Sequence, residues 1–306
     1  MNIASIDIGT NTVLMLIANI NKDDKTIKPL LNEYKMPRIG KGLVPGGAIS
    51  KERIEDLFQV LNKYSVLIRD YNCNKIIAKG TSALRLASNS QEIISAIRSK
   101  FGIDVEVISG KEEARLSYIG SISAASSDTF IVIDIGGGST EIISGSRTEI
   151  KYSKSFNVGV VSLTERYIHH DPPKPRELTL MNNIIVNTFD ELRDVLPRNA
   201  AVIAVAGTPT SLSCMKMGLK KYNEEKVEGS SLTRSQLQYF INELSLLSHT
   251  EIKEKYQQIV EGRDDIILTG TMILYNLTEI LNSNEIIVSG RGIRYGSLVD
   301  YLNMPL

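Results

Sequence analysis

Residues 133–141 read Ile-Asp-Ile-Gly-Gly-Gly-Ser-Thr-Glu, and apolar residues stand directly before and after them. This pattern predicts a buried strand, a tight glycine turn and a second strand. Glycine carries no Cβ, so backbone N–H groups in such a turn can approach an anion closely, and Asp134 at the end of the first strand suits a cation. An ordinary glycine hairpin explains the isolated stretch equally well. The candidate phosphate-binding residues of this turn are Gly136, Gly137, Gly138, Ser139 and Thr140.

The same phrase occurs near the start of the chain, where residues 6–12 read Ile-Asp-Ile-Gly-Thr-Asn-Thr. Asp7 and Asp134 are 127 positions apart, and the strand-glycine phrases that end at Gly80 and Gly207 have the same offset. Two pairs of phrases at one offset indicate an internal duplication, and repeats of this length favour two homologous domains over a repeat array.

A third pair of phrases locates an insertion in the second copy. Ser109 and Ser289 each follow an apolar run and precede a glycine, but they are 180 positions apart, which is 53 more than the other pairs. We therefore expect a mostly helical insertion at about residues 215–284. The predicted domains are residues 1–126 and residues 127–306.

Composition is that of a globular protein, with 42% hydrophobic and 23% charged residues in 306. Lysines plus arginines equal aspartates plus glutamates at 35 each, so the overall charge does not favour a nucleic-acid partner. The two cysteines and three histidines have no metal-site spacing. No apolar run reaches the length of a membrane span, and the first twenty residues lack the features of a signal peptide, so we expect a cytoplasmic protein.

Strands alternate with helices along both copies, and each copy starts with a strand meander. This order predicts an α/β fold with two ribonuclease-H-like domains that flank a cleft, and the two Asp-Gly turns are expected on its opposite walls.

Phrases along the whole chain carry a family resemblance. They start at Asp7 (Asp-Ile-Gly-Thr-Asn-Thr), Thr81 (Thr-Ser-Ala-Leu-Arg), Ile108 (Ile-Ser-Gly-Lys-Glu-Glu-Ala-Arg), Asp134 (Asp-Ile-Gly-Gly-Gly-Ser-Thr-Glu), Ala206 (Ala-Gly-Thr-Pro-Thr-Ser) and Val288 (Val-Ser-Gly-Arg-Gly-Ile-Arg). The chain resembles the exopolyphosphatase / guanosine pentaphosphate phosphohydrolase family, which belongs to the actin-like ATPase superfamily.

The resemblance implies hydrolysis of a terminal phosphoanhydride bond with Mg²⁺ or Mn²⁺. Phosphoryl transfer depends on charge neutralisation and in-line positioning, which agrees with these residue types. Asp7 and Asp134 would hold the metal directly or through water. A second phosphate cradle would consist of Gly9, Thr10 and Asn11.

The family's catalytic glutamate maps onto Glu113, and its phosphate-binding arginine maps onto Arg85. Adjacent helical residues point about 100° apart, so Glu112 and Glu113 cannot face one site equally. We interpret Glu112 as a first-turn acid favoured by the helix dipole. Upstream, Lys35, Arg38 and Lys41 lie in a loop that fits either a rail for a long polyanion or an ordinary solvated loop.

Inorganic polyphosphate is the first substrate that these residues suggest, and guanosine pentaphosphate is the alternative within the same chemistry. A small-molecule kinase or ATPase of the superfamily would need an adenosine pocket around residues 207–211 and 290–294, and the Glu113 phrase argues against it. A third hypothesis is a sensor that binds polyphosphate or a guanosine alarmone without hydrolysis. The family often forms homodimers, so a homodimer is a further expectation.

Overall fold

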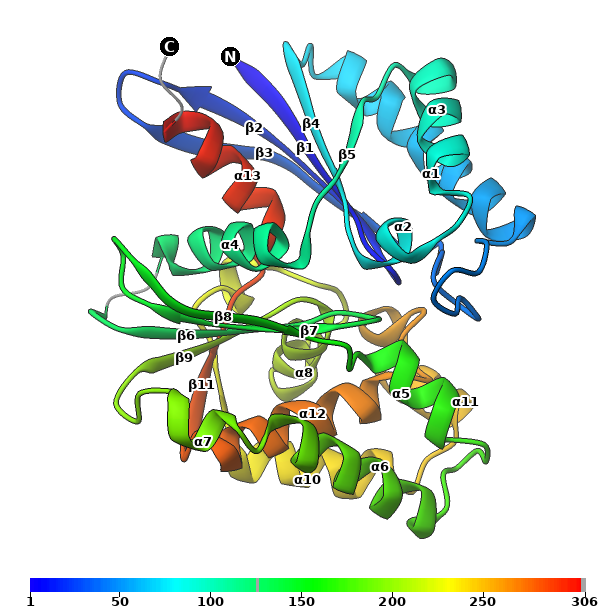
Figure 1. Ribbon diagram of the computed structural model, residues 1–306, viewed down its shortest axis with the longest axis vertical. Helices are drawn as coiled ribbons and strands as arrows, with labels where there is room; N and C mark the ends of the chain where they lie inside the picture. Colours follow the sequence, from blue (N-terminus) through cyan, green and yellow to red (C-terminus); the bar gives the residue numbers. More distant parts are fainter. Residues whose placement is uncertain (125–126, 304–306) are drawn as a thin grey trace. The chain divides into compact units, whose positions relative to one another are not determined.

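A computed structural model describes residues 1–124 and 127–303 (Figure 1). The chain divides into two compact units. The first unit consists of Met1–Gly120 and Ile293–Leu306, and the second consists of Ser121–Gly292.

The first unit is built on a five-stranded mixed sheet in the order β3-β2-β1-β4-β5. The first three strands form an antiparallel meander, and β1, β4 and β5 run parallel. The strands are β1 (Asn2–Ile8), β2 (Val13–Asn21), β3 (Thr26–Lys35), β4 (Lys75–Gly80) and β5 (Val105–Val107).

Helices cover both faces of this sheet because successive side chains of β1 point to opposite faces. Ala4, Ile6 and Ile8 belong to the buried cluster formed with α1 and α3, whereas Ile3 packs with α13. Figure 1 shows α1 and α3 side by side in this unit. The helices are α1 (Lys51–Asp70), α2 (Ser82–Leu86), α3 (Ser90–Phe101), α4 (Gly110–Ser121) and α13 (Gly292–Asn303).

The second unit has a six-stranded mixed sheet in the order β10-β11-β9-β6-β7-β8. Its meander is antiparallel, β6, β9 and β11 run parallel, and β10 pairs antiparallel with β11. The strands are β6 (Phe130–Ile135), β7 (Thr140–Gly145), β8 (Ile150–Phe156), β9 (Ala201–Val205), β10 (Ser231–Thr233) and β11 (Glu285–Val288).

The helical layer of the second unit is centred on α12, which contacts α5, α6, α8 and α10. Nearly every residue of α12 is buried, including the polar residues Thr269, Thr271, Asn276 and Thr278. The elements are η1 (Ile122–Ala124), α5 (Val160–Tyr167), α6 (Pro175–Phe189), α7 (Leu192–Val195), α8 (Gly207–Lys216), α9 (Glu224–Val227), α10 (Arg234–Leu244), α11 (His249–Tyr256), η2 (Gln257–Val260) and α12 (Ile267–Ile280).

The sheets support the predicted duplication. The order β3-β2-β1-β4-β5 of the first unit corresponds strand by strand to β8-β7-β6-β9-β11 of the second. The additional residues of the second copy lie between α8 and β11, where they form α9 to α12, η2 and the extra edge strand β10. The insertion is therefore mostly helical, but it also extends the sheet.

The observed division differs from the predicted domains in two respects. The second unit starts at Ser121, whereas residue 126 of the predicted boundary lies outside the described residues. The chain returns to the first unit at Ile293, because Tyr295 and Leu298 of α13 are buried against β1 and β2. The Ser5 hydroxyl also donates a hydrogen bond of 3.0 Å to the carbonyl oxygen of Arg294. The C-terminal helix therefore belongs with the first sheet.

Within the described residues, no helix combines the length and the apolar character needed to cross a membrane.

Candidate active site

The turn between β1 and β2 contains the first predicted phosphate cradle. The Gly9 amide donates a hydrogen bond of 2.9 Å to the Thr12 carbonyl, and this bond closes the turn. Asp7 lies at the end of β1, opposite Leu14 of β2, and is partly buried. The structure thus places Asp7 and residues 9–11 in one short hairpin.

Asn11 contributes a buried polar atom to this hairpin. The residue is 7% exposed, and no described residue makes a hydrogen bond with its side-chain Oδ1. A buried amide oxygen normally accepts a hydrogen bond or binds an ion. The Asn11 side chain is therefore suited to an additional group at this turn, such as a water molecule or a cation with its hydration shell.

The turn between β6 and β7 repeats this arrangement at the offset of 127. The Gly136 amide donates 2.9 Å to the Ser139 carbonyl, as Gly9 does to Thr12. Asp134, which is 8% exposed, occupies the position of Asp7 at the end of its strand. The two copies thus share an acidic strand end and a closed turn.

The N-terminus of α5 holds the glycine turn from one side. The amides of Val160 and Val161 donate to the carbonyls of Gly136 and Gly137 at 3.0 and 2.8 Å. Because two carbonyls of the turn are bound in this way, the turn has a fixed orientation. In the described part of the chain no backbone group accepts a hydrogen bond from the amides of Gly137 and Gly138. These amides are suited to bind an anion.

Gly159 makes this support possible, although no sequence motif had identified it. A Cβ at residue 159 would lie 2.4 Å from the Gly137 carbonyl oxygen, a distance that no side chain tolerates. The available signal was a glycine directly before a helix, 20 residues after the glycine turn, but its contact with that turn is a tertiary feature.

The Thr140 hydroxyl, a predicted phosphate ligand, has a partner within the protein. Thr140 Oγ1 donates a hydrogen bond of 2.6 Å to the Val158 carbonyl, and the residue has no exposed surface. This hydroxyl therefore stabilises the base of the hairpin, and it would have to leave the Val158 carbonyl to donate to a phosphate. Ser139 is also buried, at 4% exposed.

Arg85 and Glu113 form an ion pair in the first unit. Arg85 Nη1 lies 3.0 Å from Glu113 Oε2 and 2.8 Å from the Ile108 carbonyl. The Glu113 side chain is 9% exposed and that of Arg85 is 28% exposed. The start of α2 is fixed to the end of β1 by a hydrogen bond of 3.1 Å from the Thr81 amide to the Ile8 carbonyl. Arg85 is thus carried by a helix attached to the Asp7 strand.

Only one nitrogen of the Arg85 guanidinium makes these contacts. Among the described residues, none accepts a hydrogen bond from Nε or Nη2. Guanidinium donors bind phosphate oxygens in a planar, bidentate manner. The structure therefore leaves one edge of Arg85 suited to a phosphate while Nη1 orients Glu113.

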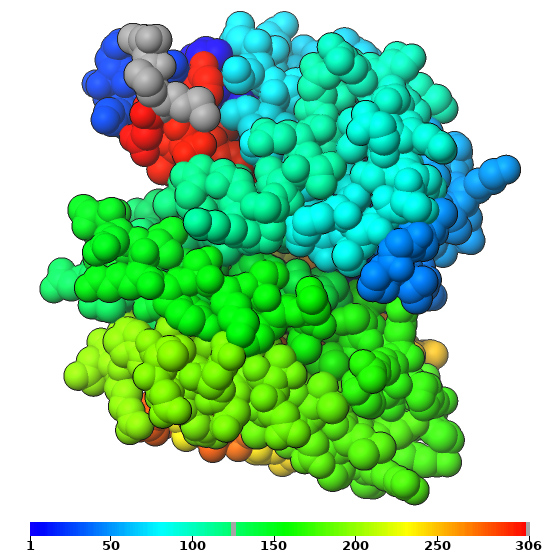
Figure 2. Space-filling view, in the orientation of Figure 1, coloured from blue at the N-terminus to red at the C-terminus, as the bar shows by residue number. Residues whose placement is uncertain are grey.

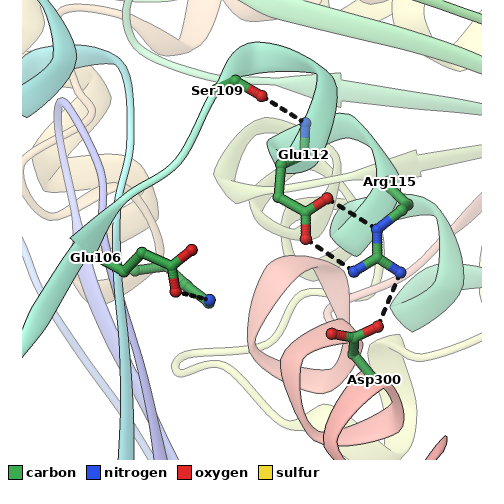
Figure 3. Close-up of polar contacts among 6 residues, drawn as sticks. Glu106, Ser109, Glu112, Arg115 and Asp300 are labelled. Atoms are coloured by element: carbon green, nitrogen blue, oxygen red, sulfur yellow. Dashed lines mark hydrogen bonds and ion pairs between the residues drawn. The ribbon is translucent and has the colours of Figure 1, made fainter. Parts of the chain in front are cut away.

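Glu112 has a different partner, as the helical spacing predicts (Figure 3). Its two carboxylate oxygens accept hydrogen bonds of 2.7 and 2.8 Å from Arg115, which also pairs with Asp300 at 2.8 Å. Its amide donates to Ser109 Oγ at 3.2 Å. The hydrogen bonds to Glu112 and Asp300 raise the pKa of Arg115. Glu112 is thus a structural acid that helps to bind α4 to α13.

The donor chemistry fits a hard divalent cation. Asp7 in the first unit and Asp134 in the second each provide carboxylate oxygens, which suit Mg²⁺ and Mn²⁺. No group of three or more histidine, cysteine, aspartate or glutamate side chains suited to a metal occurs among the described residues. Mg²⁺ commonly binds through one or two carboxylates, with water and substrate phosphates as the remaining ligands.

We compared the chain with known protein families, curated proteins and solved structures. The sequence matches the Ppx/GppA phosphatase family over residues 16–304. The chain belongs to that family. The predicted family is thereby confirmed.

Two curated proteins are similar over most of the chain. A bifunctional 3-dehydroquinate synthase/phosphatase of Fusobacterium nucleatum is 30% identical over 97% of the chain, which spans 46% of that protein's length. Exopolyphosphatase 2 of Mycobacterium tuberculosis is 28% identical over 91% of the chain and 90% of its own length. The chain thus spans about half of one relative and most of the other.

Among solved structures, an exopolyphosphatase from Cytophaga hutchinsonii superimposes with a TM-score of 0.91 at 29% identity. The match covers 99% of this chain and 98% of that one. The predicted α/β class with two domains of the actin-like ATPase type is confirmed by this family of structures and by the two corresponding sheets.

Proposed function

We propose that the chain is a metal-dependent exopolyphosphatase that removes the terminal phosphate of inorganic polyphosphate as orthophosphate. The broader class, hydrolysis of a phosphoanhydride bond, is supported by the family and by relatives named exopolyphosphatase. The observation that carries the proposal is the Arg85–Glu113 pair, in which a buried carboxylate is held by a guanidinium with donors left for a phosphate.

In this proposal Glu113 is the general base. It removes a proton from a water molecule as the water oxygen attacks the terminal phosphorus and the bridging P–O bond breaks. The shortened chain leaves as a phosphate anion, and the proton passes from Glu113 to solvent or to a product. Arg85 Nη1 keeps the carboxylate oriented, and Nε and Nη2 bind oxygens of the reacting phosphate, where negative charge must be stabilised.

The two hairpins bind phosphate through the backbone. The amides of Thr10 and Asn11 in the first unit and those of Gly137 and Gly138 in the second are the closely approachable donors, because the amides of Gly9 and Gly136 close their own turns. Asp7 and Asp134 would hold Mg²⁺ or Mn²⁺, which when bound neutralises phosphate charge during the displacement. We give Thr140 a supporting role in this proposal, because its hydroxyl donates to the Val158 carbonyl.

The test is phosphate release from polyphosphate, guanosine pentaphosphate and ATP, measured side by side for three proteins. The Glu113→Gln variant should lose about 10²–10⁴-fold in kcat, the usual contribution of a general base. The matched control is Glu112→Gln, which makes the same change one residue away at a carboxylate bound to Arg115. It should keep near-normal turnover. Equal losses in both variants would refute the role of Glu113.

The substrates separate the alternatives. Preference for guanosine pentaphosphate would assign the same residues to alarmone hydrolysis. Phosphate transfer from ATP only with an acceptor present would indicate a kinase. Polyphosphate binding without release from any substrate would refute the hydrolase and leave a sensor.

A further inference from the structure

The chain from the end of β3 to the start of α1 is rich in basic residues. Residues 34–51, here called the basic loop, comprise the last two residues of β3, the connecting segment and the first residue of α1. They include Lys35, Arg38, Lys41 and Lys51 and no aspartate or glutamate, although Glu33 and Glu52 directly adjoin them. The chain as a whole has equal numbers of basic and acidic residues, so this excess is local. Figure 2 shows the segment at the surface of the first unit, in blue.

One part of the basic loop is docked on the hairpin that follows Asp7. The Arg38 amide donates 3.1 Å to the Asn11 carbonyl, and the Gly40 amide donates 2.9 Å to the Thr10 carbonyl. A Cβ on Gly40 would lie 2.2 Å from Thr10 Cγ2, so only glycine permits this approach. Arg38 adopts a left-handed conformation with φ +53°, which costs a non-glycine residue free energy and tends to occur at functional sites.

The far part of the loop is anchored beside Arg85. The Gly46 amide donates 3.2 Å to the carbonyl of Leu86, the residue after Arg85. The Asn89 side chain accepts from the Ile49 amide at 3.0 Å and donates to the Ile49 carbonyl at 2.9 Å. The basic loop therefore bridges the phosphate hairpin and the helix of Arg85. This anchoring argues against the alternative of an ordinary solvated loop.

Two lysines of the loop have no counter-ion among the residues that the structure describes. Lys35 and Lys41 are exposed, and in the described part of the chain no carboxylate pairs with either of them. Lys41 directly follows Gly40, whose amide donates to the Thr10 carbonyl, so Lys41 is adjacent in the chain to the residue that contacts the hairpin. Unpaired cations held beside a phosphate-binding turn attract a polyanion.

We propose that the basic loop binds internal phosphates of the substrate, with Lys41 and Lys35 as determinants of chain-length preference. This inference rests on the proposed exopolyphosphatase function. The hairpin and Arg85 bind the phosphate that is hydrolysed, and the lysines bind phosphates farther along the chain. A short substrate such as tripolyphosphate ends before it reaches them, so the loop stabilises long chains selectively.

The experiment compares Lys41→Gln and Lys35→Gln with Lys28→Gln. Lys28 is an exposed lysine of β3, the strand that ends at Lys35, but it lies near the opposite end of that strand, where its backbone is in register with Asn19 of β2. Seven residues of strand separate the two positions by about 23 Å. Phosphate release is measured with long-chain polyphosphate and with tripolyphosphate at low and high salt. Binding of both compounds is measured separately in a Glu113→Gln background, which does not depend on turnover.

For long chains, KM should rise about two- to fivefold for each loop lysine, the range expected for one exposed ion pair, with kcat unchanged. The salt dependence of KM should become weaker. The KM for tripolyphosphate should change little in the loop variants, and Lys28→Gln should have the same KM as the parent protein for both substrates.

Equal effects on both substrates, or no effect on long chains, would overturn the loop's role. If the parent protein releases no phosphate, the proposed function fails, and binding then decides about the loop. Weaker binding of long chains alone would support it, and unchanged binding would refute it.

Discussion

The ion pair between Arg85 and Glu113 can be tested with Arg85→Met, Glu113→Gln and the double variant. Arg85→Met keeps the aliphatic stem but leaves a carboxylate that is 9% exposed without its 3.0 Å partner. Loss of a charged hydrogen-bond partner at a buried group costs about 1.5–3 kcal/mol. Because the Arg85 side chain is 28% exposed, solvent screening lowers this to about 1–2 kcal/mol.

Glu113→Gln should cost less, since a glutamine oxygen still accepts a hydrogen bond from Arg85. The double variant has no unpaired buried charge, so its loss in the free energy of unfolding should be about 1 kcal/mol smaller than the sum of the single losses. Urea unfolding at pH 7 gives the three free energies, and phosphate release gives the rates. The rate losses should also be non-additive, because the two side chains act as one unit. Additive unfolding free energies, within about 0.4 kcal/mol, would refute a functional pair at this position.

Three further predictions concern positions outside this pair. Thr140→Val removes the hydroxyl that donates to the buried Val158 carbonyl, so it should lower the free energy of unfolding by about 1–3 kcal/mol and change kcat little. A large loss of kcat at normal stability would instead indicate that Thr140 binds phosphate. Gly159→Ala places a Cβ 2.4 Å from the Gly137 oxygen and should reduce kcat by displacing the glycine turn, which steady-state kinetics with polyphosphate can measure. The hydrogen bond with His170 lowers the pKa of Glu177 to about 2, so the ionised Glu177 stabilises the fold above its unfolded pKa, and this stabilisation disappears as the pH falls toward 2. Glu177→Gln should therefore make the free energy of unfolding less dependent on pH on the acid side. If the urea midpoint of the variant has the same pH profile as the parent between pH 5 and pH 3, this prediction is wrong.

The sequence predicted the elements that repeat. The 127-residue offset identified both Asp-Gly hairpins and the duplicated sheet, because strand-glycine phrases are local patterns of burial and turn chemistry. Helical spacing also separated Glu112 from Glu113. Contacts between distant segments were not predictable in this way. The position of α13 on the first sheet depends on Tyr295 and Leu298 meeting residues nearly 300 positions earlier, and an apolar helix alone does not specify its sheet.

Side-chain roles inside the hairpins show the same limit. The sequence shows that Thr140 places a hydroxyl next to a glycine turn, but the partner of that hydroxyl is the carbonyl of Val158, 18 residues later. Arg85 was inferred from a motif, whereas its division into one occupied nitrogen and two available ones requires coordinates. A sequence pattern therefore identifies which groups lie near a site, and the hydrogen bonds around them determine which groups remain available for a ligand.

At their glycine turns, the two copies differ in what supports the turn. Both turns are closed by the same glycine hydrogen bond, to Thr12 in one and Ser139 in the other. In the second copy the turn carbonyls are bound by the N-terminus of α5, whereas in the first they are bound by the basic loop. In each case a glycine, Gly159 or Gly40, lets the support approach within contact of the turn. Since the closed turn is common to both copies and the support is not, we expect phosphate binding to be the shared property, and the proposed selection of long chains to depend on the first copy alone.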